Sequence, residues 1–194
     1  MGSRLLLGTA AASNVAVALA TLAARGWNAP GAHAAARNTA RFSCLWFLVA
    51  FAAPGLARLA RGLPAGARLV QAFVSAHLVH FATVAALIAA FERAHLAEKP
   101  GQSAAILLIG FSVVVGAGLT ATPRSSRFYS AVHQVTLYLI FLIFFLAFAR
   151  NAVKPLRLLA VLLAWALLLR LVAAARNLSN PVNAWRVKSL NSKS

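Results

Sequence analysis

Six long apolar runs, separated by short polar connections, constrain the fold of this chain more than any other feature. Each run is close to the roughly 20 residues that an α-helix needs to cross a bilayer. A lipid-exposed segment must satisfy its own backbone amide groups, and these runs are continuous rather than alternating in polarity, so we expect helices and not a β-barrel. The predicted spans are residues 5–24, 42–60, 69–91, 104–122, 128–149 and 158–175.

The predicted fold is therefore all-α, a polytopic membrane protein whose six-transmembrane-helix bundle occupies residues 1–176. A polar, basic tail is expected at 177–194. The composition agrees, since 61% of the 194 residues are hydrophobic and 11% are charged. A soluble domain averages about half apolar and about a quarter charged residues. We expect no separate soluble domain, because no polar stretch is long enough to form one.

The chain is strongly basic, with 19 Lys and Arg against 2 Asp and Glu and a formal net charge of +17. In a soluble protein this balance would indicate nucleic-acid binding. Here the basic residues lie mostly between the apolar runs, where they orient helices and meet anionic headgroups. We therefore expect membrane lipids, and no nucleic acid, as partners. Arg170 lies inside the last run, and we expect it to snorkel to the interface.

Lys and Arg are more numerous on the side of the two termini than on the opposite side of the predicted bundle. Cytoplasmic loops of membrane proteins carry such an excess of positive charge. We therefore expect both termini in the cytoplasm. On the opposite side, the stretch Gly26–Gly31 is expected to begin the first loop, with Trp27 at the membrane interface.

Three of the five histidines, His77, His80 and His133, fall inside predicted helices. Ionisable side chains at membrane depth are costly and usually face a partner, a cavity or a cofactor. Imidazoles from two separate helices can fill both axial positions of a haem iron. His77 and His80 are three residues apart and share roughly one helix face. One of them can therefore ligate iron while the other bonds a propionate, a quinone or a neighbouring group.

The depth of these histidines in the membrane can be compared. From Arg68, helical rise places His77 and His80 roughly 14 and 18 Å along their helix. From Arg127, it places His133 roughly 9 Å along a helix of the same direction. Depth alone favours His77 as the partner of His133. Two other interpretations stay open: histidines that only bond between helices, and a metal ion held by all three, with no carboxylate or thiol to neutralise its charge.

The third apolar run resembles the third helix of the ferric-reductase-like transmembrane family. That family includes the membrane cores of NADPH oxidases and ferric reductases and the haem-binding subunit of bacterial methionine sulfoxide reductase systems. Arg68 followed by the stretch Ser75–Thr83 is similar to the family pattern, with His80 at or within one residue of the ligand position. The likeness covers about residues 40–150.

The fifth run resembles the fifth helix of the same family, where a histidine after a basic loop is soon followed by a tyrosine. His133 and Tyr138 match that order. Many members carry a second histidine further along each ligand helix, but the region around Leu146 has none, and His95 falls in a predicted loop. The tryptophan often found before the helix-five histidine is also missing.

The resemblance implies one haem b, with His80 and His133 as iron ligands and His77 beside it. It implies a b-type cytochrome subunit of the bacterial inner membrane, the electron-transfer part of an oxidoreductase. Such a subunit relays electrons to or from a partner membrane or redox protein, or a quinone. The alternative is a non-catalytic scaffold or assembly subunit of a larger membrane complex that has lost the haem site. A transporter is disfavoured, because no acidic relay lies inside the predicted spans.

Overall fold

The computed structural model describes residues 3–56, 66–91, 100–121, 127–149 and 154–178. Within these ranges the chain forms helices and no strand, which confirms the all-α prediction. The predicted loop that holds His95 and the tail beyond Leu178 lie outside the described residues. The helices are α1 (Ser3–Arg25), α2 (Ala29–Leu56), α3 (Gly66–Phe91), α5 (Pro100–Thr120), α6 (Arg127–Ala149) and α7 (Lys154–Leu178).

Five of these helices, α1, α2, α3, α6 and α7, are long and apolar enough to cross a membrane. The described side chains of α5 form a shorter apolar helix, Leu108–Thr120. Large apolar side chains are widely exposed along the bundle; Leu108 and Trp165, for example, are 67% and 60% exposed. Exposed apolar surface on this scale is expected where helices contact lipid. The chain therefore has the fold of an integral membrane protein, as predicted.

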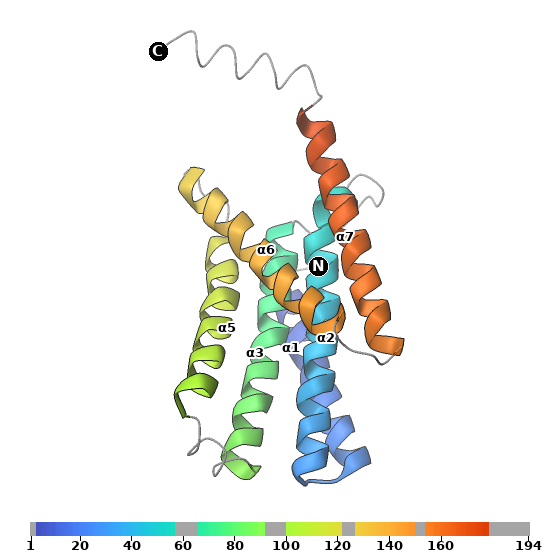
Figure 1. The fold of residues 1–194 in the computed structure, drawn as a ribbon, viewed down its shortest axis with the longest axis vertical. Coiled ribbons are helices and arrows are strands. Elements are labelled where there is room, and N and C mark those ends of the chain that lie inside the picture. Colours follow the sequence, from blue (N-terminus) through green and yellow to red (C-terminus); the bar gives the residue numbers. More distant parts are fainter. Residues whose placement is uncertain (1–2, 57–65, 92–99, 122–126, 150–153, 179–194) are drawn as a thin grey trace.

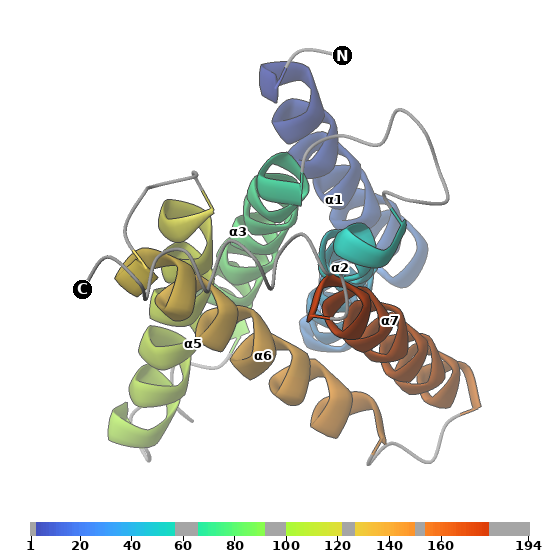
Figure 2. The same ribbon diagram turned by 90° about the horizontal axis from the view of Figure 1, so that it is seen from above.

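Successive helices alternate in direction, so that α3 and α6 run the same way, as the sequence predicted (Figure 1). The first three helices pack closely on one another, and α7 packs on α2. Helix α5 packs on both α3 and α6, and α6 also packs on α7 (Figure 2). Helix α6 crosses the bundle at a steep tilt, whereas α2 and α3 lie closer to the long axis (Figure 1).

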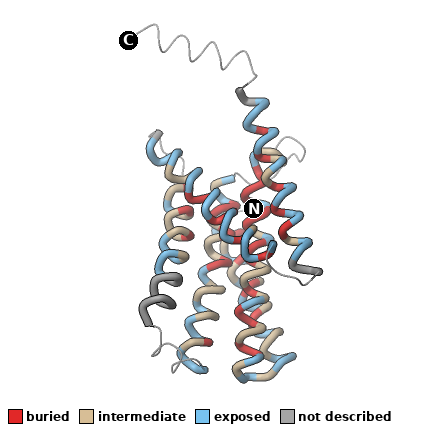
Figure 3. The backbone as a smooth tube through the Cα atoms, in the orientation of Figure 1, coloured by how far each residue is buried: buried red, intermediate tan, exposed pale blue. Residues whose placement is uncertain are grey.

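The core lies where α2, α3 and α6 meet, and it is rich in phenylalanine. Phe47 of α2 is fully buried, with its ring centroid 5.2 Å from that of Phe73 in α3 and 5.5 Å from that of Phe144 in α6. Phe51 lies one turn along α2 and stacks on Phe141 at 5.2 Å. Figure 3 shows buried residues concentrated on the inner faces of these helices.

Helix α2 begins much earlier than expected. The sequence predicted a span from Phe42, preceded by a loop, but the helix starts at Ala29 and continues to Leu56, past Pro54. The prediction of a loop through residues 29–41 was therefore wrong. Hydropathy detects only the apolar part of a helix. The first half of α2 is too polar and basic to be detected in this way.

A tight corner between α1 and α2 makes this early start possible. Gly26 has a φ of 87°, and its N–H donates to the Leu22 carbonyl at 2.8 Å, which ends α1 with a left-handed glycine. Asn28 then caps α2, because its Oδ1 accepts the Gly31 N–H at 2.8 Å. Two residues, Trp27 and Asn28, are thus enough to reverse the chain after Gly26.

Candidate functional site

His77 is buried in the interior of the bundle and hydrogen-bonds to α2. Its Nδ1 lies 2.7 Å from the Ser43 Oγ. The Ser43 hydroxyl donates to the Ala40 carbonyl of its own helix at 2.9 Å, so its oxygen is left to accept a hydrogen bond from His77. The hydrogen-bond network therefore assigns His77 a protonated Nδ1 and an Nε2 with a free lone pair.

His80 repeats this arrangement one turn further along α3. Its Nδ1 lies 3.1 Å from the Thr39 Oγ1, and Thr39 donates to the Ala35 carbonyl at 2.9 Å. Thr39 and Ser43 lie one turn apart on α2 and match the two histidines on the antiparallel α3. The imidazole centroids of His77 and His80 are 4.9 Å apart, so the two rings lie on one face, as their spacing predicts.

His133 of α6 has the same kind of partner on a different helix. Its Nδ1 lies 3.1 Å from the Thr120 Oγ1 near the end of α5. Thr120 donates to the Gly116 carbonyl at 2.7 Å, an arrangement that favours the His133 tautomer with its proton on Nδ1. A hydrogen bond of this kind from Nδ1 fixes the ring orientation of metal-binding histidines and leaves Nε2 to ligate.

Aromatic side chains surround His77 on several sides. Its ring centroid lies 5.3 Å from that of Phe73 and 4.8 Å from that of Phe81, both on α3. On the side of α6, Phe144 meets the imidazole edge to face at 5.5 Å. Walls of this kind are apolar and suit a flat macrocycle, and they also provide ordinary core packing.

The structure brings together His77 and His80 but does not join His133 to them. Phe144 is the α6 side chain that contacts His77, and about 16 Å of helical rise separates it from His133. Among the described residues, no group of three or more His, Cys, Asp or Glu side chains could hold a metal ion. A metal site made of the three histidines is therefore not formed in this part of the chain.

Arg170, which we expected to snorkel to the interface, is instead buried and only 7% exposed. Its Nη1 donates to the Phe51 carbonyl at 2.9 Å, and its Nη2 donates to Gln134 Oε1. The guanidinium carbon also lies 4.6 Å from the ring centre of Phe51 and 5.5 Å from that of Tyr138. The expectation was wrong because this face of α7 turns inward, toward α2 and α6. An arginine inside an apolar run was itself the signal for a buried role.

The resemblance to the ferric-reductase-like family rests on short stretches of sequence, and the comparisons with known proteins do not extend it. The chain matches no protein-family model, no curated protein and no solved structure.

Proposed function

We propose that the protein is a membrane b-type cytochrome subunit that relays single electrons through one bis-histidine haem. The donor or acceptor would be a partner redox protein or a quinone. One observation carries the proposal: the Nδ1 atoms of His77, His80 and His133 each lie within hydrogen-bond distance of a hydroxyl, an arrangement in which Nε2 would be the nitrogen that ligates iron. A haem b iron held by two such nitrogens supplies one-electron chemistry without an open position for oxygen.

The residues present fit a haem in their donor chemistry and in their apolar surroundings. His133 of α6 would supply one nitrogen ligand of the haem iron, and a histidine of α3 would supply the other. We favour His77 as that partner, because its depth along α3 is closer than that of His80 to the depth of His133 along the parallel α6. The ring contacts of His80 are with His77 and Phe81 of its own helix. This choice departs from the family pattern, which favours His80.

The protein's own contribution would be to orient the ligands and to exclude water. The hydroxyls of Ser43 and Thr120 would fix the orientations of the His77 and His133 rings, respectively. Phe73 and Phe144 keep the surroundings of His77 apolar and shield its imidazole from water. Helices α3 and α6 are not among the closely packed helix pairs, so side chains rather than backbones meet between them.

A scaffold or assembly subunit without haem is the second candidate. The separation of His133 from His77 and His80 favours this role, because the three imidazole rings do not face a common point. In that case the three histidines would serve as interhelical hydrogen-bond donors to Ser43, Thr39 and Thr120.

A difference spectrum of the purified, full-length protein, expressed with added haem precursor, tests the proposal. We expect the reduced-minus-oxidised spectrum of a low-spin b haem. His77→Ala and His133→Ala should each abolish it, while His80→Ala and the control His33→Ala, at the far end of α2, should retain it. Gel filtration would show that each variant is still folded. A wild-type protein that binds no haem overturns the proposal and leaves the scaffold.

A further inference from the structure

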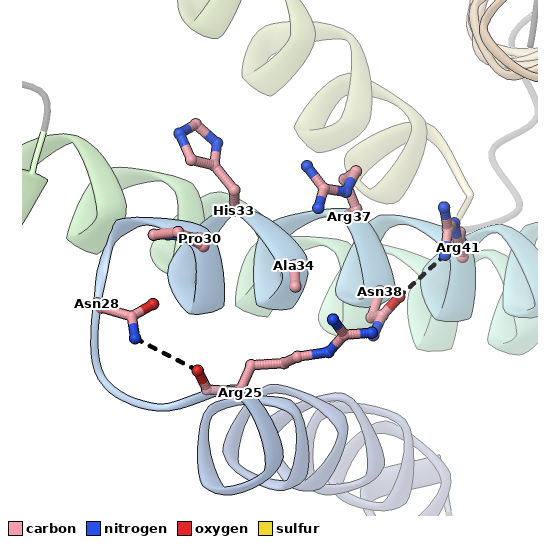
Figure 4. A pocket seen from close by; sticks show the side chains of 8 residues that line it. All are labelled: Arg25, Asn28, Pro30, His33, Ala34, Arg37, Asn38 and Arg41. Atoms are coloured by element: carbon pink, nitrogen blue, oxygen red, sulfur yellow. Dashed lines mark hydrogen bonds between the residues drawn. The ribbon is translucent and has the colours of Figure 1, made fainter.

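A basic cavity of about 810 Å³ lies at the corner between α1 and α2 (Figure 4), and none of His77, His80 and His133 lines it. Figure 4 shows Arg25 reaching from the end of α1 along α2 toward Asn38, with Arg37 and Arg41 one turn apart on α2. The polar residues that line the cavity are Arg25, Asn28, His33, Arg37, Asn38 and Arg41.

The charge of this cavity is of one sign. Three guanidinium groups line it, and no carboxylate does so among the described residues. The chain has only two acidic residues in all, Glu92 and Glu98, and both lie outside the described ranges. Arg41 donates from Nη1 to Asn38 Oδ1 at 3.1 Å, which holds its side chain against the wall and leaves further N–H donors. The planar guanidinium group of arginine carries several N–H donors whose spacing matches the oxygen atoms of a phosphate group.

The corner that carries the cavity is rigidly built. A Cβ at Gly31 would lie 2.0 Å from the Gly26 carbonyl oxygen, so the two backbones touch directly. Asn28 ties both helices together, since its Nδ2 donates to the Arg25 carbonyl and its Oδ1 accepts from Gly31. The backbone segments that carry Arg25 and the α2 arginines are therefore held in a fixed relation before any ligand binds.

The cavity lies at the depth of the lipid headgroups. Helix α2 has 28 residues, or about 42 Å of rise, whereas the hydrocarbon core is about 30 Å thick. The polar first half of α2 must therefore extend beyond the hydrocarbon. Trp27 marks the same level, because it is 71% exposed beside the cavity and tryptophan concentrates at the membrane interface.

We propose that this cavity binds a phosphate-bearing anion, and that the source of the phosphate is an anionic membrane lipid. Arg25, Arg37 and Arg41 would bind the phosphate oxygens. The acyl chains would lie along the exposed apolar surface of the bundle. This site is independent of His77, His80 and His133, so it stands whether or not the protein binds haem.

Binding can be measured on the full chain in a neutral detergent, by native mass spectrometry and by the shift in thermal unfolding midpoint. The probes are phosphatidylglycerol, phosphatidylcholine and inorganic phosphate. We expect phosphatidylglycerol to bind and to raise the midpoint. The double variant Arg25→Gln/Arg37→Gln removes two charged donors and should weaken that binding by about tenfold or more. Arg157→Gln, an exposed arginine of α7 outside the cavity, is the matched control and should bind as the wild type does.

The outcomes separate the possible sources. Tight phosphatidylglycerol binding that the double variant loses supports the lipid as the source. Binding of inorganic phosphate that the double variant loses, without lipid binding, supports the phosphate site but overturns the lipid source. Equal binding of phosphatidylcholine, or a double variant that binds phosphatidylglycerol like the wild type, overturns the proposal. The unfolding midpoint without lipid shows whether the double variant is folded.

Discussion

At the scale of single residues, Arg170 illustrates how a charge can be buried inside a membrane bundle. Its guanidinium reaches a backbone carbonyl of α2, an amide of α6 and the faces of two aromatic rings. Each of these partners is electron-rich, so the cation is stabilised without a carboxylate. The same residue therefore links α7 to both α2 and α6, which makes it a structural contact and not only a flanking charge.

We predict that Arg170→Lys destabilises the bundle although it keeps the charge. A lysine has one ammonium group and cannot reach both the Phe51 carbonyl and the Gln134 amide, as the planar guanidinium does. The loss of one buried bond should cost about 1–3 kcal/mol. The thermal unfolding midpoint in detergent would measure this, with Arg157→Lys on the same helix as control. A midpoint equal to that of the control would contradict the buried role of Arg170.

The residues of the histidine site were only partly predictable from the sequence. His77, His80 and His133 could be found because an ionisable group inside an apolar run is unusual. Their partners Thr39 and Thr120 could not, because a hydroxyl is common in membrane helices and bonds to its own backbone by default. Which hydroxyl faces which imidazole depends on the rotation of α2 and α5, and hydropathy does not contain that information.

At the scale of helices, the sequence located the apolar part of every span but missed the start of α2. Five of the helices begin and end within about four residues of the predicted spans, since the ends of an apolar run are ordinarily uncertain by that much. Helix α2 begins 13 residues early, at Ala29 instead of Phe42. The capping pattern was present in Gly26, Asn28 and Pro30, but an Asn followed by Pro and Gly is also typical of a loop.

We predict that Gly31→Ala opens the corner between α1 and α2. The new Cβ would lie 2.0 Å from the Gly26 carbonyl oxygen, a contact with backbone that no side-chain rotation can relieve. Overpacking of this kind costs about 1–3 kcal/mol. The variant should have a lower unfolding midpoint and weaker binding of phosphatidylglycerol in the α1–α2 cavity.

Gly8→Ala is the matched control for this change. Gly8 lies within α1, and a Cβ there would meet nothing within 4 Å. Replacing an interior helical glycine by alanine should then be neutral or stabilise the helix by about 0.5–1 kcal/mol. If both variants had the same midpoint, the close approach at Gly31 would not constrain the corner.

At the scale of the whole molecule, the tilt of α6 decides how the candidate site is arranged. The sequence predicted that the third and fifth spans run parallel, and they do (Figure 1). It could not predict the tilt, which brings Phe144 rather than His133 against His77. A helix rotates and tilts according to the side chains it packs against, here those of α5 and α7. The order of the helices was therefore predictable, while the convergence of their side chains was not.

The alternation in direction of the six helices in the described residues makes a prediction about the sides of the membrane. If every helix crosses, the beginning of α1 and the end of α7 lie on one side, and the α1–α2 corner lies on the other (Figure 1). From the excess of basic residues on the side of the termini, we predict that this side faces the cytoplasm. Single cysteines introduced at exposed positions, with the buried Cys44 replaced by alanine, can test this. The reagent is a maleimide that does not cross membranes, applied to intact bacterial cells.

We expect Trp27→Cys to be labelled in intact cells, and Arg4→Cys and Arg176→Cys to be labelled only after lysis. All three positions are exposed, so access to the reagent depends on the side of the membrane. Labelling of Arg4→Cys but not of Trp27→Cys in intact cells would reverse the orientation. Labelling of Arg176→Cys but not of Arg4→Cys would mean that an odd number of helices cross. Helix α5 would then be the first candidate for a helix that does not span, because its described apolar part, Leu108–Thr120, is the shortest of the six.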